Sequence, residues 1–183
     1  MALSEADNPA PAFPAHILET TGDNRVWWVA HTKSRREKAL AHFMAGRGIG
    51  YYLPLIKKRQ PGRGRTRYSL MPLFSGYLFF SGTPEERYRA YTSNHIARVI
   101  AIQNQAGLLD ELRSIQHVLA SGAPVYPYDF LSVGQRVRIS SGPMRGCEGI
   151  IDRKKGRCRL VLQVQTIAQA IALDLEADMV EAA

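Results

Sequence analysis

The chain has 183 residues, 45% hydrophobic and 22% charged, with a formal net charge of +8, values that suit one medium or two small globular domains. Its 2 cysteines are too few for a disulfide scaffold and lack the spacing of a metal site. The longest apolar run, residues 70–80, is too short to cross a bilayer, and the first residues do not have the pattern of a secretory signal. We therefore exclude a disulfide-rich secreted protein and a helical membrane protein, and expect a cytoplasmic monomer that does not contact a membrane.

The positive charge is concentrated in one part of the chain. Residues 26–122 carry 15 Lys and Arg against 5 Asp and Glu, whereas residues 134–183 carry 8 against 6. A concentrated positive field attracts polyanions, so this segment favours nucleic acid or an acidic protein surface as a partner. A basic domain with no nucleic-acid role is the alternative that charge alone leaves open.

The chain begins with a predicted disordered leader, residues 1–25, because this stretch holds three prolines and shows no periodicity. Residues 26–31 are a predicted strand. The sequence from Ser34 to Glu37 has the pattern of a capping box, which predicts a helix that starts at Ser34 and ends near Gly46. Residues 49–56 form the next predicted strand, in which Pro54 indicates an edge or an irregularity.

Residues 57–68 predict the tip of an exposed β-hairpin. Six of these twelve residues are basic, and Pro61, Gly62 and Gly64 mark a turn. Arg and Lys at such a tip gain from counterion release when they contact phosphate, so the segment predicts a nucleic-acid contact. A solvated loop without a ligand is the alternative.

The apolar run at residues 70–80 predicts the central strand of a sheet. Tyr77 and Phe79 point to one side and Leu78 and Phe80 to the other, so both faces need cover. A strand packed between two layers is the simpler interpretation. The alternative is that Tyr77 and Phe79 meet a partner protein.

The rest of the chain predicts a helix after Thr83, a strand at residues 97–102, a helix at residues 106–120 and then a second unit of short strands. The fold class is therefore α+β: an N-terminal α/β sandwich with an antiparallel sheet, then a small C-terminal β-barrel. Residues 166–180 are alanine-rich and also compatible with a helix. The predicted domains are residues 1–25 (leader), 26–122, 123–132 (linker) and 133–183.

Two sets of motifs resemble a known family. The second unit, with Gly134–Ile139, Ser141-Gly142-Pro143 and Glu148-Gly149, resembles a KOW motif. The first unit resembles the N-terminal domain of the NusG transcription factors. The matching segments are Trp27-Trp28-Val29 for the opening aromatic strand, Leu73–Phe79 for the central strand of Phe-Pro-Gly-Tyr type, and Arg98-Val99 before the fourth strand.

The resemblance implies a transcription elongation and antitermination factor that is not an enzyme and uses no cofactor or metal. In this family the N-terminal domain binds the clamp coiled coil of RNA polymerase through an apolar groove, reaches across the DNA channel to the opposite lobe, and suppresses pausing or termination. Carried over by position, the polymerase-binding residues are His31, Phe74, Tyr77, Phe79 and Ile102 in the groove, and Arg89 and Thr92 for the contact across the channel.

The resemblance and the charge together also indicate a nucleic-acid surface and a second partner. Lys33, Arg35 and Arg36 lie where the family would face the DNA or RNA of the elongation complex, and Arg63, Arg65 and Arg67 belong to the basic hairpin. In the family the KOW domain recruits a ribosomal protein or a termination factor, and the resemblance implies such a partner here.

The chain departs from the family pattern in ways that indicate a specialised, RfaH-like member. Ser75 stands where the family usually has proline, His31 where it usually has an apolar or aromatic residue, and residues 166–170 lack the usual glycine and prolines. No Walker loop, metal-spaced histidine set or Gly-x-Ser-x-Gly motif occurs. A ribosomal-type RNA-binding KOW protein is the alternative function.

Overall fold

The structure is a computed structural model that describes residues 8–19, 24–60, 67–130, 134–154, 157–176 and 179–183. The chain divides into two compact units, residues 1–105 and residues 106–183. Each unit has its own antiparallel sheet, and helices are present in both, which confirms the predicted α+β class.

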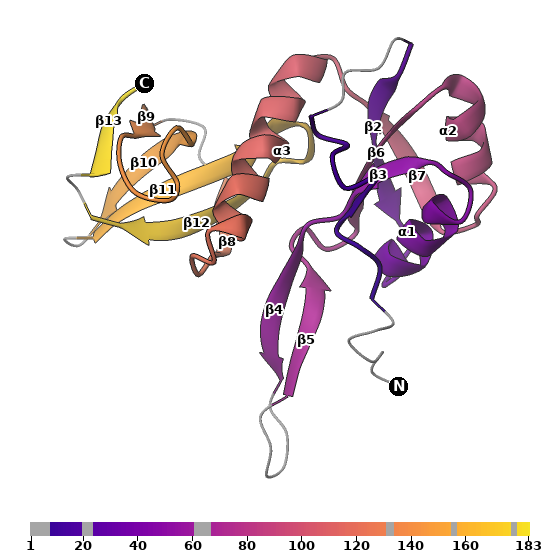
Figure 1. Ribbon diagram of the computed structural model, residues 1–183, viewed down its shortest axis with the longest axis horizontal. Helices are drawn as coiled ribbons and strands as arrows, with labels where there is room; N and C mark the ends of the chain where they lie inside the picture. The colour runs from indigo at the N-terminus through magenta and orange to yellow at the C-terminus, as the bar shows by residue number, and fades with distance from the viewer. Residues whose placement is uncertain (1–7, 20–23, 61–66, 131–133, 155–156, 177–178) are drawn as a thin grey trace. The chain divides into compact units, whose positions relative to one another are not determined.

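The first unit is built on a five-stranded antiparallel sheet with the strand order β1-β3-β6-β2-β7 (Figure 1). The central strand is β6, Tyr77–Gly82, as predicted from its apolar residues on both sides. The other strands are β1 (Ala12–Phe13), β2 (Val26–Thr32), β3 (Gly50–Tyr52) and β7 (Ile96–Ala101).

Two helices, α1 (Glu37–Ala45) and α2 (Pro84–Tyr91), cover one face of this sheet. Leu78 and Phe80 of β6 pack there against Leu40 of α1 and Ala90 of α2, and all four side chains are fully buried. Such burial stabilises by about 1.5–3 kcal/mol for each large apolar side chain. The start of α2 is as predicted, since the Thr83 hydroxyl accepts from the backbone N–H of Glu86.

The predicted start of α1 is wrong. The helix begins at Glu37, three residues after Ser34, and its N-cap residue Arg36 makes no side-chain hydrogen bond to the helix. Arg35 adopts a φ of 58°, which breaks helical geometry just before this point. The Ser34–Glu37 pattern therefore does not form a capping box, and the Glu37 carboxylate makes a different contact that is described below.

Residues 8–19 are not a disordered leader. Ala12 and Phe13 form β1 and pair with Tyr52 and Tyr51 of β3. The phenol of Tyr51 donates to the carbonyl oxygen of Ala10 at 3.0 Å. Ile17 and Leu18 are buried, with only 5% and 1% of their surface exposed. The prediction of disorder is wrong for this stretch because its two large aliphatic residues are buried and β1 pairs with the main sheet.

The predicted strand at residues 49–56 is two strands that separate at Pro54. β3 remains in the main sheet, whereas β4 (Leu55–Gln60) leaves it and pairs with β5 (Arg67–Pro72). The carbonyl oxygen of Pro54 accepts from the N–H of Leu73 at 2.8 Å, at the base of this two-stranded ribbon. The ribbon extends away from the main sheet of its unit (Figure 1) and confirms the predicted hairpin, whose turn at residues 61–66 lies outside the described residues.

The second unit contains a six-stranded antiparallel sheet with the order β13-β9-β10-β11-β12-β8. The sequence predicted five of these strands, and residues 166–180, which were also compatible with a helix, contribute one strand and the start of another. Apolar residues on both faces of the strands are buried, such as Leu160, Val161 and Leu162 of β11. The predicted strands are β9 (Gln135–Ile139), β10 (Glu148–Lys154), β11 (Arg157–Val164), β12 (Gln169–Leu175) and β13 (Val180–Ala182).

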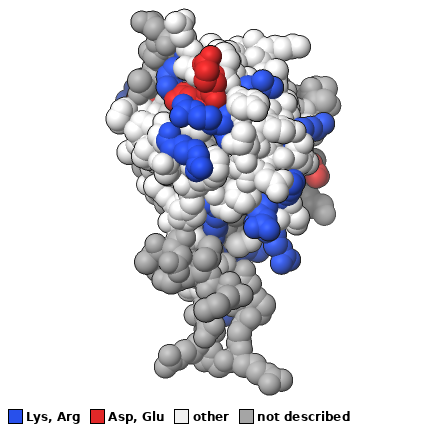
Figure 2. Space-filling view, turned by 90° about the vertical axis from the view of Figure 1, so that its right-hand side faces the viewer, with Lys and Arg blue, Asp and Glu red and all other residues white. Residues whose placement is uncertain are grey.

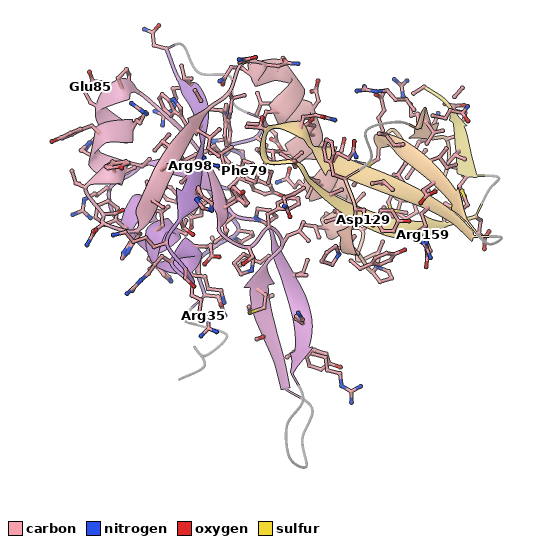
Figure 3. The ribbon with its side chains drawn as sticks, turned by 180° about the vertical axis from the view of Figure 1, so that it is seen from behind. Arg35, Phe79, Glu85, Arg98, Asp129 and Arg159 are labelled. Carbon is pink, nitrogen blue, oxygen red and sulfur yellow. The ribbon has the colours of Figure 1, made fainter. Side chains whose placement is uncertain are left out.

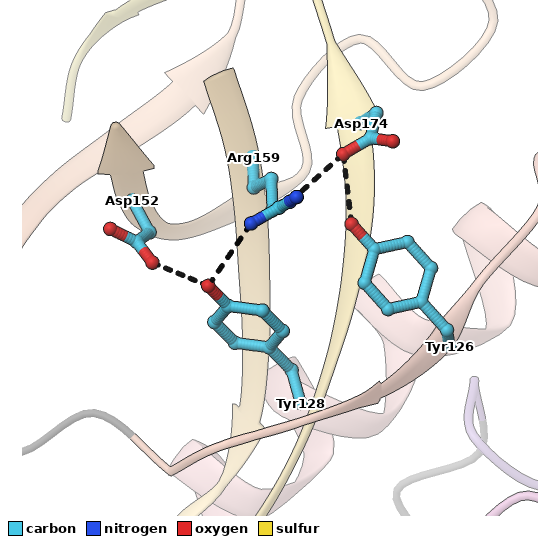
Figure 4. A network of polar contacts seen from close by, with 5 residues as sticks. All are labelled: Tyr126, Tyr128, Asp152, Arg159 and Asp174. Atoms are coloured by element: carbon cyan, nitrogen blue, oxygen red, sulfur yellow. Dashed lines mark hydrogen bonds and ion pairs between the residues drawn. The ribbon is translucent and has the colours of Figure 1, made fainter. Parts of the chain in front are cut away.

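The sixth strand, β8 (Tyr126–Tyr128), comes from the predicted linker. It pairs with β12, and a polar network fixes it there (Figure 4). The phenol of Tyr126 donates to Asp174 Oδ1 at 2.8 Å, and the phenol of Tyr128 donates to Asp152 Oδ2 at 2.5 Å. Arg159 Nε donates to Asp174 Oδ1 at 3.0 Å and balances the acidic charge. Residues 126–128 are therefore part of the second unit.

The helix α3, Gln105–Ala120, falls almost entirely within the second compact unit, whereas the sequence places it in the domain at residues 26–122. Its polar contacts there explain the grouping. The Glu111 carboxylate accepts from the N–H of Gln165 at 3.3 Å, the Ser114 carbonyl oxygen lies 3.9 Å from the thiol of Cys147, and His117 Nε2 lies 2.8 Å from the Pro143 carbonyl oxygen.

Replacement of the buried leader residue Leu18 by alanine is expected to destabilise the first unit by about 2–5 kcal/mol, because it leaves a cavity. Trp27 and Trp28 are the two tryptophans of the chain and both lie in β2, so urea unfolding followed by tryptophan fluorescence reports on this unit. Glu19→Ala, at an exposed neighbouring position, is the control. Identical midpoints for Leu18→Ala and the parent would contradict the packing of the leader.

Burial raises the pKa of Glu111 to about 6, and the N–H of Gln165 and the charge of Arg136 oppose this only in part. The ordinary pKa of a glutamate, 4.5, applies to the unfolded chain. Between this pH and about pH 6, the folded chain therefore binds more protons than the unfolded chain, and folding takes up a proton. The contribution of Glu111 to stability therefore increases as pH falls through this window.

Glu111→Gln is expected to raise the melting temperature of the second unit at about pH 7.5 and to lose this advantage near pH 4.5. Thermal unfolding followed by far-UV circular dichroism at both pH values measures the difference. Asp110→Asn, at the exposed position next to it, is the control. An advantage of equal size at both pH values would contradict the raised pKa.

Candidate partner-binding surface

The face of the first sheet opposite α1 and α2 collects the predicted groove residues. The register pairs His31 of β2 with Tyr77 of β6 and with Arg98 of β7, and it pairs Val29 with Phe79. Directly paired residues share a face, so His31, Tyr77, Phe79 and Arg98 lie on the same side of the sheet (Figure 3 labels Phe79 and Arg98).

Aromatic contacts fix these side chains in two pairs. The rings of His31 and Tyr77 are 5.1 Å apart, and those of Phe74 and Phe79 are 6.2 Å apart and nearly perpendicular. Phe74 and Phe79 are 2% and 0% exposed, whereas His31 and Tyr77 are half-buried. Of these two pairs, His31 and Tyr77 offer ring surface to a partner, while Phe74 and Phe79 support them from within.

Ile102 lies just beyond the end of β7. Val29 pairs with Ile100, so alternation places Ile102 on the same face as Phe79. Its carbonyl oxygen accepts from Gln105 Nε2 at 3.0 Å, and the same amide nitrogen donates to the carbonyl oxygen of Trp27. The structure therefore brings all five predicted groove residues to one face.

A buried carboxylate holds the turn that precedes β6. Glu37 Oε1 accepts from the N–H of Gly76 at 2.7 Å, and Glu37 is only 6% exposed. The carbonyl oxygen of Gly76 in turn accepts from the N–H of Thr32 at 2.8 Å. Gly76 has a φ of 83°, a conformation that favours glycine, and an added Cβ would lie 3.8 Å from the His31 ring.

Sequence reasoning missed this role of Glu37. The carboxylate was assigned to a capping box with Ser34, whereas its partner is 39 residues away. Local spacing carries no signal for such a contact. The only pointer was the Ser75-Gly76 pair, which correctly predicted a bend before the central strand.

A basic cluster lies at the start of α1. Lys33, Arg35 and Arg36 are all exposed, and Lys33 Nζ donates to Asn94 Oδ1 at 2.5 Å. Burial and the nearby charges of Arg36 and Lys33 lower the pKa of His95, so this imidazole stays neutral more readily. Arg35 is labelled in Figure 3. The predicted nucleic-acid residues of this segment thus form one positive area that suits an anionic ligand.

On the side of the first unit that carries the two helices, basic side chains are more widespread than acidic ones (Figure 2). Lys and Arg occur in several places on this face, whereas the acidic side chains are gathered mainly in one place. Glu85 and Glu86 in the first turn of α2 are acidic residues of this region. A face of this kind favours a polyanion over a cationic partner.

The remaining predicted site residues lie elsewhere on the first unit. Arg89 and Thr92 are exposed at the end of α2, where the Thr92 hydroxyl donates to the carbonyl oxygen of Arg89 at 2.7 Å. They are on the helical layer, apart from the groove face. Arg67 lies in β5 opposite Gln60. Arg63 and Arg65 lie outside the described residues.

Among the residues that the structure describes, no group of three or more His, Cys, Asp and Glu side chains is placed to hold a metal ion. No helix in the described part of the chain is long and apolar enough to span a membrane.

Comparison with known proteins gave one family match. The NusG family model, described as transcription termination factor nusG, matches residues 25–120. This range contains the whole five-residue groove set, both helices of the first unit and α3. Among curated proteins, no sequence matches the chain significantly.

The contact between Glu37 and Gly76 predicts a contrast between two substitutions. Glu37→Ala leaves the partly buried N–H of Gly76 without its acceptor and is expected to destabilise the first unit by about 1–3 kcal/mol. Ser34→Ala should have no measurable effect, because Ser34 does not cap α1.

Urea unfolding followed by tryptophan fluorescence measures both variants, and hydrogen exchange should show faster exchange at Gly76 in Glu37→Ala. The opposite order, with Ser34→Ala more destabilised than Glu37→Ala, would support the capping box and contradict the observed contact.

Proposed function

The chain belongs to the NusG family of transcription factors, and on that premise we propose that it is an elongation and antitermination factor that binds RNA polymerase and suppresses pausing or termination. The NusG family consists of transcription factors rather than enzymes. The observation that carries the proposal is the family match over the unit whose sheet face presents the groove residues.

The contact with the polymerase clamp coiled coil is assigned to the groove face. His31 and Tyr77 supply partly exposed ring surface, and the exposed Arg98 beside them offers a cation to an acidic partner. Aromatic residues and Arg are enriched where protein interfaces gain most of their binding energy. Arg89 and Thr92 on α2 are proposed for the second contact, across the DNA channel.

The basic cluster of Lys33, Arg35 and Arg36 is proposed to face the nucleic acid of the elongation complex. The second unit is proposed to be a KOW domain that recruits a ribosomal protein or a termination factor. The departures at Ser75, His31 and residues 166–170 support a specialised, RfaH-like role rather than a housekeeping one.

A ribosomal-type RNA-binding module is the second candidate function. The exposed basic side chains of β4 favour it, because they would contact phosphates without polymerase. It predicts RNA binding that weakens steeply with salt and falls when Arg63, Arg65 and Arg67 are replaced by alanine.

The groove is tested through its partly exposed residues. Phe79→Ala is unsuitable, because loss of a fully buried phenylalanine costs about 3–5 kcal/mol of stability and would confuse folding with binding. The double variant His31→Ala, Tyr77→Ala is expected to bind RNA polymerase at least about 10-fold more weakly.

Pull-down with purified RNA polymerase measures the binding, and a pause assay on a template with a strong pause measures the consequence. The parent should shorten pause lifetimes and the double variant should not. Met71→Ala, at an exposed apolar position on the hairpin, is the control and should behave as the parent. Full binding by the double variant would reject the groove assignment.

A further inference from the structure

The β4–β5 hairpin has two different faces. The register pairs Lys57 with Leu70 and Arg59 with Tyr68, so these four residues share one face. Lys58 pairs with Ser69 on the other face. The two strands form a sheet of their own, separate from the main sheet of the unit. Side chains near the end of this ribbon are therefore presented away from the core of the unit.

The first of these faces combines one aromatic ring with two cations. Tyr68 is 59% exposed, so a large part of its apolar ring surface is open to a ligand. Lys57 Nζ lies 5.4 Å from the centre of the Tyr68 ring, within cation–π range. Lys57 and Arg59 are both exposed. We call Lys57, Arg59 and Tyr68 the stacking face.

The stacking face suits a nucleic-acid strand with unpaired bases, which offers both flat bases and phosphates. A flat exposed phenol accepts the π-face of any base, and such stacking tolerates all sequences. Lys57 and Arg59 are two residues apart on one strand, which spaces them by about 6–7 Å, so they can meet different phosphates. Residues 57–68 contain no acidic side chain that would repel the backbone.

We propose that the stacking face binds single-stranded nucleic acid, with a base stacked on Tyr68 and phosphates on Lys57 and Arg59. A duplex fits less well, because its bases are already stacked on each other and cannot cover the ring. An acidic protein surface would use the two cations but would not require an aromatic platform. This site is separate from the groove face and needs no polymerase.

The test is fluorescence anisotropy of the full chain with labelled oligonucleotides of about 12 nucleotides, within the range of single-strand binding sites. Oligo-dT and oligo-rU are compared with a duplex of equal length. Tyr68→Ala and Tyr68→Leu should each weaken binding to the single strands by about 5- to 100-fold, because neither side chain can stack. Tyr68→Phe keeps the ring and should bind as the parent does.

A matched pair of lysines tests the orientation of the face. Lys57→Ala should weaken binding and reduce the salt dependence of log affinity by about one unit of slope, as expected for one lost phosphate contact. Lys58→Ala removes the same charge from the opposite face and should change affinity less. Far-UV circular dichroism shows whether each variant is folded.

Several outcomes would overturn the proposal: parent-like binding by Tyr68→Ala, equal effects of Lys57→Ala and Lys58→Ala, or equal affinity for the duplex. Tighter binding of the single strands than of the duplex would support it. The ratio of the affinities for oligo-dT and oligo-rU then shows whether DNA or RNA is the preferred strand. The measurements contain no polymerase, so their failure counts against the RNA-binding candidate but leaves the proposed binding of RNA polymerase intact, and failure of the polymerase pull-down leaves the stacking face intact.

Discussion

The contact on which the first unit depends is the hydrogen bond from the Gly76 N–H to the buried carboxylate of Glu37. It joins the first turn of α1 to the bend before β6, and the Gly76 carbonyl oxygen extends the link to β2 through Thr32. One side chain thereby connects a helix, the central strand and its neighbour. Because β6 begins at Tyr77, the position of Tyr77 on the groove face follows from where this bend is held.

The second constraint is the two-residue period of β6. Leu78 and Phe80 face the helices, while Tyr77 and Phe79 face the opposite side. The same strand therefore supplies the core and the candidate binding surface. A shift of one residue in register would exchange the two sets, placing Tyr77 in the core and Phe80 on the surface, so binding and folding depend on the same pairing.

Features set by local chemistry were predictable from the sequence, and features set by distant partners were not. The cap at Thr83, the central strand and the basic hairpin depend on neighbouring residues, and the predictions agree with the structure. The role of Glu37, the order of residues 8–19 and the strand β8 depend on contacts that bring distant segments together. For the candidate site, the sequence identified the shared face, but it could not show that Phe74 and Phe79 are buried while Tyr77 is partly exposed.

The strand β8 has a consequence for how the second unit can be isolated. It lies at the edge of the six-stranded sheet and pairs there with Ala170, Ile171 and Ala172 of β12. A fragment that starts at residue 133 would lack β8 and leave β12 as an open edge, a template for pairing between chains. It would also leave Asp174 and Asp152 without their tyrosine partners. A soluble form of this unit should therefore begin before α3, which belongs to the same unit, and not within the segment that the sequence alone marks as a linker.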